Sequence, residues 1–136
     1  MPEETYKPRK LFTLKEANDT LPLVSRIVKD IIRLNGDIQE THALAGELAA
    51  EGRSVKVEEA KDRLHDLVHQ VAELVDELRE IGCLAKGPEL GLVDFPARVG
   101  SRVVFLCWKY GEEEIRFWHE MDAGYAGRKS VRGVFV

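Results

Sequence analysis

The clearest pattern in the chain is a pair of apolar repeats whose members are three and four residues apart in alternation. Because an α-helix has about 3.6 residues per turn, such spacing places one apolar stripe along each of two helices. A polar segment at 51–54 separates the repeats. The pattern predicts a long antiparallel coiled-coil helical hairpin over residues 14–82. The first repeat comprises Val24, Ile27, Ile31, Leu34, Ile38, Thr41, Ala45 and Leu48, and the second comprises Val57, Ala60, Leu64, Leu67, Val71, Leu74, Leu78 and Ile81.

The ends of these helices carry recognisable signals. Thr13 and Glu16 have the spacing of a capping box, in which each side chain bonds the backbone amide of the other, so a helix is predicted to begin at Leu14. Pro22 lacks an amide hydrogen and clashes with the preceding turn, which predicts a bend and a second helix beginning at this proline. Gly82 predicts the end of the last helix.

The apolar surface of the hairpin is wider than a seam between two helices requires. Either the C-terminal half of the chain or a second copy of the hairpin covers this face, and we expect a second copy, hence a homodimer. Gly36 and Gly46 either permit a close helix crossing or are tolerated surface glycines. The additional apolar residues are Val28, Ile32, Val68, Ala72 and Val75.

The C-terminal part of the chain is rich in β-branched and aromatic residues and predicts a β-hairpin. Its strands are expected at residues 102–109 and 114–120, joined by a turn at 110–113. A connector at 83–91 precedes them. Phe95 stands before a proline and is therefore expected to be extended.

The register of this β-hairpin determines which side chains share a face. Pairing Lys109 with Glu114 places Cys107 and His119 on opposite faces, since side chains alternate along a strand. A cysteine nucleophile with a histidine base needs both groups on one face. Thiol catalysis is therefore not expected.

These elements predict a single domain over residues 1–136 of the α+β class, mainly α. It consists of the helical hairpin at 14–82 and a small aromatic-rich β module at 83–136. Eight of the ten aromatic residues fall between Phe95 and Val136. The formal net charge of −4 averages an acidic hairpin and a nearly neutral module.

Composition excludes several classes of protein. Two cysteines, Cys83 and Cys107, are too few for a disulfide framework and lack C-x-x-C spacing, which favours a reducing cytoplasm. No stretch approaches the roughly 18 apolar residues of a membrane span, and the N-terminus has no apolar signal segment. The acidic helices disfavour nucleic acid as a partner.

Four sequence motifs resemble a known bacterial family. They are FTLKEANDTLP at 12–22, GLVDFPA at 91–97, FLCWKYGEE at 105–113 and FWHEMDAGYAGR at 117–128. This combination is similar to the domain-of-unknown-function family 2203, and the similarity covers nearly the whole chain. The resemblance implies an arrangement of structural elements, but no activity, because none is established for the family. It draws attention to Asp94, Trp108, Trp118, His119, Asp122, Gly124, Gly127 and Arg128.

The densest group of polar residues in the β module suggests a metal site. His119 and Asp122, with Asp94 or Glu120 as a third ligand, offer the imidazole nitrogen and carboxylate oxygens that suit a divalent transition metal. An open coordination position would allow water activation. The spacing matches no known metal signature.

A second interpretation of the same region is a ligand site. The glycine-containing turn at 124–128 could bind a small anion through its backbone amides and the Arg128 guanidinium. The aromatic and polar residues around it would complete the site. The expected ligand-binding residues are Asp94, Trp108, Trp118, Glu120, Tyr125 and Arg128.

The same residues also fit a structural role. His119 could donate a hydrogen bond to Asp94 or to a backbone carbonyl, and Arg128 could pair with Asp122, with both tryptophans in the core. His65 and His69, four residues apart, have metal-ligand spacing but take outward heptad positions, and we expect them to be exposed.

No complete set of catalytic residues is present. The sequence favours a non-enzymatic, dimerising interaction or ligand-binding protein of the bacterial cytoplasm, with another protein or a small anion as partner. The alternative is a small metal-binding protein or metal-dependent enzyme that uses the histidine and carboxylates of the C-terminal module.

Overall fold

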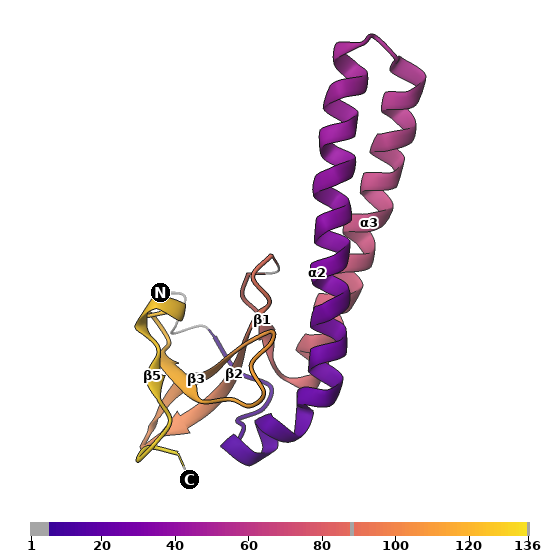
Figure 1. Cartoon of the computed structure of the whole chain (residues 1–136). Helices are drawn as coiled ribbons and strands as arrows, with labels where there is room; N and C mark the ends of the chain where they lie inside the picture. The colour runs from indigo at the N-terminus through magenta and orange to yellow at the C-terminus, as the bar shows by residue number, and fades with distance from the viewer. Residues whose placement is uncertain (1–5, 88, 136) are drawn as a thin grey trace.

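Two long helices form a hairpin whose base packs against an antiparallel sheet (Figure 1). The computed structural model describes residues 6–87 and 89–135; the remaining residues of the predicted domain, 1–5, 88 and 136, lie outside the described residues. The α+β fold class is confirmed. The elements are α2 (Leu14–Ala50), α3 (Ser54–Ile81), β1 (Leu84–Ala85), β2 (Leu92–Val99), β3 (Arg102–Lys109), β4 (Phe117–Glu120), the 3₁₀ turn η1 (Tyr125–Gly127) and β5 (Lys129–Ser130).

The helix ends follow the sequence signals. Thr13 accepts a hydrogen bond from the Glu16 amide at 3.0 Å, and Glu16 accepts one from the Thr13 amide at 2.9 Å, so the capping box is formed. Gly82 ends α3 with a φ of 114°, in the left-handed region that favours glycine. Neither helix has an apolar stretch long enough to cross a membrane.

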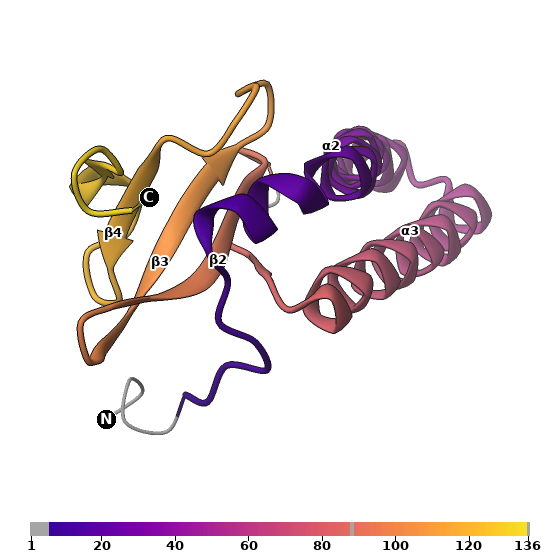
Figure 2. The ribbon, with the colours of Figure 1, turned by 90° about the horizontal axis from the view of Figure 1, so that it is seen from below.

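The prediction of a separate helix beginning at Pro22 is wrong. The proline lies inside α2, which runs without interruption from Leu14 to Ala50. Figures 1 and 2 show the expected bend near the N-terminal end of α2. A proline inside a helix removes only one backbone hydrogen bond, and burial of Ala17, Leu21 and Val24 on either side holds the helix together.

The C-terminal module is larger than the predicted β-hairpin. Its five strands pair in chain order, β1-β2-β3-β4-β5, and every pair is antiparallel. β2 contains Phe95 and Pro96, and β1 lies within the predicted connector. A proline is tolerated there because β1 pairs only as far as Asp94, which leaves the amide side of Pro96 without a strand partner.

The predicted register between the third and fourth strands is also wrong. Cys107 pairs with Phe117 and Phe105 pairs with His119, so the true register is displaced by one residue. The second strand begins at Phe117, and not at Glu114, because the loop between the strands is longer than a four-residue turn. A one-residue shift moves every side chain to the other face of the sheet.

One face of the sheet forms the core with the base of the hairpin. Figure 2 shows α2 passing across the sheet. Gly91 lies where the C-terminal module packs against α2: its φ is +68°, and a Cβ there would lie 2.8 Å from Tyr110 Cβ and 3.0 Å from Ile32 Cδ1. Val28 is only 2% exposed. The chain's own C-terminal half therefore covers the lower part of the widened apolar face.

Candidate functional site

The second face of the sheet, turned away from the helices, carries a small buried polar cluster. Side chains alternate along β2, β3 and β4, so Val93, Phe95 and Leu106 enter the core while their neighbours Asp94 and Cys107 point the other way. We call this second face the outer face of the sheet. His119 belongs to it because it pairs with Phe105 across β3 and β4.

Asp94, Cys107 and His119 come from three adjacent strands and meet on the outer face. Asp94 on β2 pairs directly with Cys107 on β3, and His119 on β4 lies diagonally opposite Cys107, because it pairs with Phe105 two residues earlier on β3. One carboxylate oxygen, the thiol sulfur and one imidazole nitrogen lie within 4.8 Å of one another. The three residues are 3%, 1% and 2% exposed, respectively. We call them the Asp94–Cys107–His119 cluster.

Both nitrogens of His119 are engaged. Nδ1 donates to the carbonyl oxygen of Glu120 at 2.7 Å, and Nε2 lies 3.0 Å from Asp94 Oδ1. Burial by itself lowers the pKa of His119, but hydrogen bonds with Asp94, Cys107 and the Glu120 carbonyl outweigh it and raise the pKa to about 10. At neutral pH the imidazole is therefore a cation that donates through both nitrogens.

This arrangement decides what the cluster can do chemically. A histidine base that activates a cysteine keeps one nitrogen free to accept the thiol proton while the other faces a carboxylate. In His119 the carboxylate takes Nε2 and a carbonyl takes Nδ1. Thiol catalysis is not supported, although Cys107 and His119 do share a face.

A cavity of about 230 Å³ lies against the cluster. Asp94, Cys107 and His119 contribute to its lining, and the other lining residues are Lys86, Leu92, Phe105, Met121, Gly124 and Tyr125. Arg128 holds the ring of Tyr125 in place. Its guanidinium carbon lies 4.2 Å from the ring centroid, and its Nη2 donates to the Tyr125 hydroxyl at 3.2 Å.

The predicted metal ligands are only partly brought together. His119 and Asp94 belong to the cluster, but Asp122 is exposed in the turn after β4 and lies outside it. Glu120 points to the opposite side of the strand from His119 and forms a bidentate ion pair with Arg102, at 2.8 and 3.1 Å. The third ligand-bearing residue is Cys107.

The predicted ligand-binding residues are likewise divided. Asp94 and Tyr125 line the cavity, whereas Trp108 and Trp118 lie in the core between sheet and helices. Trp108 Nε1 donates to the Glu112 carbonyl at 2.9 Å, and Trp118 Nε1 has no hydrogen-bond partner among the described residues.

Arg128 does not offer its charge to an anion. Its guanidinium lies between the rings of Phe117 and Tyr125 and pairs with Glu112 at 3.1 Å, and not with Asp122 as the structural alternative expected. A guanidinium already paired with a carboxylate has little charge left for a ligand. Arg128 positions Tyr125 at the cavity.

Cys107 is the site residue that sequence reasoning missed. The displaced register had placed it away from His119, and the true register brings it to the same face. The available signal was the alternation in β2, where Asp94 is a lone acid among apolar residues and therefore needs buried polar partners.

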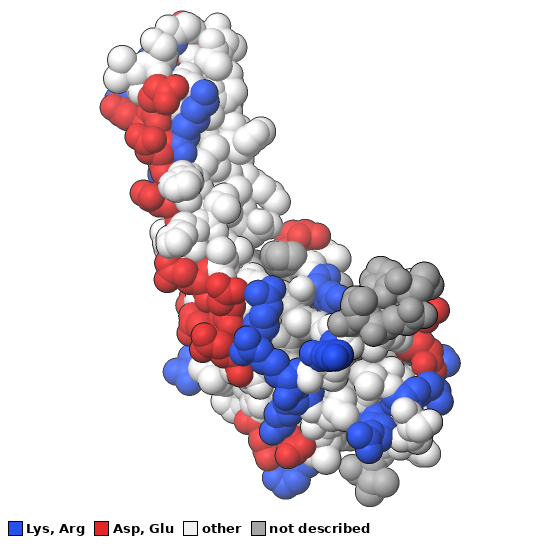
Figure 3. All heavy atoms as spheres, turned by 180° about the vertical axis from the view of Figure 1, so that it is seen from behind, with Lys and Arg blue, Asp and Glu red and all other residues white. Residues whose placement is uncertain are grey.

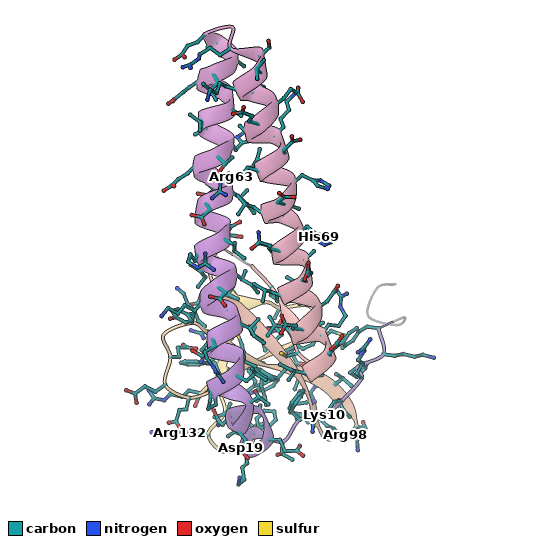
Figure 4. The ribbon with its side chains drawn as sticks, turned by 90° about the vertical axis from the view of Figure 1, so that its right-hand side faces the viewer. Lys10, Asp19, Arg63, His69, Arg98 and Arg132 are labelled. Carbon is teal, nitrogen blue, oxygen red and sulfur yellow. The ribbon has the colours of Figure 1, made fainter. Side chains whose placement is uncertain are left out.

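The exposed histidines of the hairpin are separate from this site. His65 and His69 are both exposed, as predicted, and His69 Nε2 lies 3.0 Å from Glu73 Oε1. Figure 4 shows His69 on the outer side of α3, pointing away from α2.

Comparison with known proteins adds a family without an activity. The family model described as "Uncharacterized conserved protein (DUF2203)" matches residues 10–131, which include both helices and all five strands. No curated protein and no solved structure matches the chain.

Proposed function

The chain belongs to the DUF2203 family of uncharacterised conserved proteins, so we propose its function from the geometry of the site: it binds a divalent transition metal ion through Asp94, Cys107 and His119. The observation that carries the proposal is the convergence of three different donor atoms within 4.8 Å at one buried point. The proposal concerns metal binding and includes no reaction.

The residue types favour zinc. A thiolate, an imidazole and a carboxylate are its common protein ligands, and three protein ligands leave a fourth position open in its tetrahedral geometry. The buried negative charges of Asp94 and an ionised Cys107 would be compensated by the ion. Without a metal, the charge of Asp94 is balanced by the His119 cation.

The hydrogen bond between His119 and Glu120 supports the same proposal. Metal-binding histidines commonly donate their second N–H to a carbonyl or carboxylate, which holds the ring in one orientation. Nδ1 of His119 already makes this bond, at 2.7 Å. A metal ion would then replace the proton on Nε2 of His119 and the thiol proton of Cys107. A purely structural hydrogen bond between Asp94 and His119 would not account for the thiol of Cys107 beside them.

Cobalt titration tests the proposal, because a cobalt–thiolate bond gives a charge-transfer absorption that carboxylate and imidazole ligands do not. We expect one Co²⁺ per chain with this absorption, displaced by Zn²⁺. Cys107→Ala should remove the absorption. Cys83→Ala is the matched control, because Cys83 is equally buried but packs into the core on the other face.

Three results would contradict metal binding by the Asp94–Cys107–His119 cluster. The first is a protein that remains folded and binds no Co²⁺ or Zn²⁺ at one equivalent. The second is a thiolate absorption that persists in Cys107→Ala. The third is binding that disappears in His69→Ala but persists in His119→Gln, which would assign the ion to the exposed hairpin surface.

The same ligands support a proposal about the compartment. Cys83 and Cys107 are both free thiols, and Cys107 binds metal only when reduced. We therefore extend the proposal to the reducing cytoplasm of a bacterium, in line with the resemblance of its motifs. Oxidation of the Cys107 thiol would remove one ligand from this site.

A second candidate function, self-association, is favoured by the part of the hairpin that projects beyond the sheet. Val75 packs against the core, and Val68 lies two turns further along the same face, where it is 54% exposed. In Figure 3 the projecting part is largely free of charged side chains on the side toward the sheet, while acidic residues gather along its other edge.

We propose that a second copy of the hairpin covers this uncharged face. Two copies that meet there avoid bringing their acidic edges together, whereas contact through the other edge would oppose like charges. The sheet already covers the lower part of the face, around Val28 and Ile32. The two hairpins would therefore overlap through their projecting halves.

Light scattering at micromolar concentration should give twice the 15.4 kDa chain mass. Val68→Glu should convert the protein to monomer. Val55→Glu is the control, because Val55 is 72% exposed on the same helix but about 140° away around its axis. A monomeric unmodified protein, or equal dissociation by both substitutions, would contradict the dimer.

A further inference from the structure

The cavity beside the Asp94–Cys107–His119 cluster is lined by polar and apolar side chains. The three cluster residues contribute polar groups, and Leu92, Phe105 and Met121 contribute apolar surface. Any metal ion held by the cluster would therefore be reachable from this cavity. A ligand of the ion would lie against Phe105 and Met121.

Lys86 gives the cavity an uncompensated positive charge. Its Nζ lies 5.6 Å from the centre of the Phe105 ring, and it forms no ion pair within the described part of the chain. The neighbouring cation Arg128 is paired with Glu112. Lys86 is also the only cationic side chain other than His119 among the described lining residues.

The charge balance selects the kind of ligand. A divalent ion with one carboxylate, one thiolate and a neutral imidazole has no net charge, because the two anionic ligands cancel the two positive charges. Lys86 then leaves the cavity with a single positive charge. Lys86 itself is exposed, but the cluster beside it is buried, so one monoanion neutralises the remaining charge, whereas a dianion leaves an excess negative charge against the buried cluster.

We propose that the cavity binds a small organic monocarboxylate with a short apolar body, whose carboxylate takes the open position of the metal ion and faces Lys86. This inference rests on the proposed function, since it requires the metal. The volume of about 230 Å³ admits a molecule the size of an aromatic side chain. The apolar part of the ligand packs against Phe105 and Met121.

Benzoate is a suitable probe because it combines one carboxylate with a compact apolar ring. In the protein loaded with Co²⁺, we expect benzoate to change the visible absorption of the ion and to saturate at one equivalent per chain. Benzamide, which has the same shape without the charge, should bind far more weakly, and inorganic phosphate should not compete.

Lys86→Met should weaken benzoate binding by about tenfold or more, the loss expected for one charge-assisted contact, without changing Co²⁺ stoichiometry. Lys109→Met is the matched control. Lys109 Nζ lies 5.7 Å from the ring centroid of the cavity residue Tyr125, but Lys109 does not line the cavity. Its benzoate affinity should be unchanged.

The outcomes separate this inference from the proposed function. Absence of stoichiometric Co²⁺ binding overturns both. Stoichiometric Co²⁺ binding without a response to benzoate overturns only the ligand assignment. Equal binding of benzoate and benzamide, equal binding to metal-free protein, or equal effects of the two lysine substitutions would also overturn it. Preferred binding of phosphate would replace the monocarboxylate by a dianion.

Discussion

The two ends of the helical hairpin differ in what packs against them. At the base, α2 and α3 pack against each other and against the sheet, and Val24 and Leu78 are fully buried. In the projecting half, the helices have only each other, and the seam combines buried residues such as Leu67 with half-buried ones such as Ile38 and Leu64. The base depends on contacts between distant parts of the chain, whereas the projecting half depends on local helix formation.

Matched leucine substitutions should show this difference most strongly. Leu106, on β3, is 0% exposed, and Leu106→Ala should lower the free energy of unfolding by about 2–5 kcal/mol through a cavity that the rigid sheet cannot close. Leu64→Ala, in the projecting seam, should cost about 1–2 kcal/mol because less surface was buried. Urea denaturation measures both.

Equal losses for the two leucines would contradict the comparison. In that case Leu64 would be as well packed as Leu106, as it would be beneath a partner bound to the hairpin. The measurement should therefore be repeated at several protein concentrations, since a partner of the same sequence makes stability depend on concentration.

Gly91→Ala should give the next largest loss. The residue has a positive φ, and the new Cβ would lie 2.8 Å from Tyr110 Cβ, so backbone strain and overpacking both destabilise the contact between sheet and hairpin. We expect a loss of about 1–3 kcal/mol in thermal or urea unfolding. Gly100→Ala, which also has a positive φ but meets nothing within 4 Å, isolates the strain from the packing.

The sequence predicted the helices well because their signals are local. Thr13, Glu16 and Gly82 act within one turn, and the three-and-four spacing repeats along every turn of the helix. The helix-breaking effect of Pro22 was overestimated because a short stretch of sequence does not show that its neighbours are buried in the folded core.

The register of the sheet could not be predicted because one distant contact with α2 and one local contact with β3 together hold the β3–β4 loop. The Ile115 amide donates to Asn18 Oδ1 on α2, 97 residues away, and Trp108 Nε1 donates to the Glu112 carbonyl. These bonds hold the loop after Lys109 in a longer path than a simple turn. Cys107 was excluded from the site for this reason alone.

Cys83 should make the stability of the base sensitive to alkaline pH. Burial raises its pKa to about 12, because the thiolate is disfavoured in the core. A folded-state pKa above that of the unfolded chain means that this contribution is complete below about pH 9 and is lost as pH rises from 9 towards 12. We expect a loss of about 1 kcal/mol by pH 10.

Comparison with Cys83→Ala isolates this effect from other groups that titrate at high pH. The difference in unfolding free energy between the two proteins should change between pH 8 and pH 10. A constant difference would show that the thiol ionises as easily in the folded protein as in the unfolded chain.

The smallest effect, and the one most informative about the projecting half, is expected for Gly46→Ala. A Cβ added at this position meets nothing within 4 Å, so in an isolated hairpin alanine should stabilise α2 by about 0.5–1 kcal/mol through its better helix propensity. In a homodimer whose hairpins cross closely at this glycine, the same methyl group would separate the helices and weaken association. Unfolding measured on the dissociated Val68→Glu background should therefore show the gain, while light scattering on the unmodified background shows whether the dimer weakens. A gain in both experiments would make Gly46 a tolerated surface glycine, and loss of association would place it in the contact between the two copies.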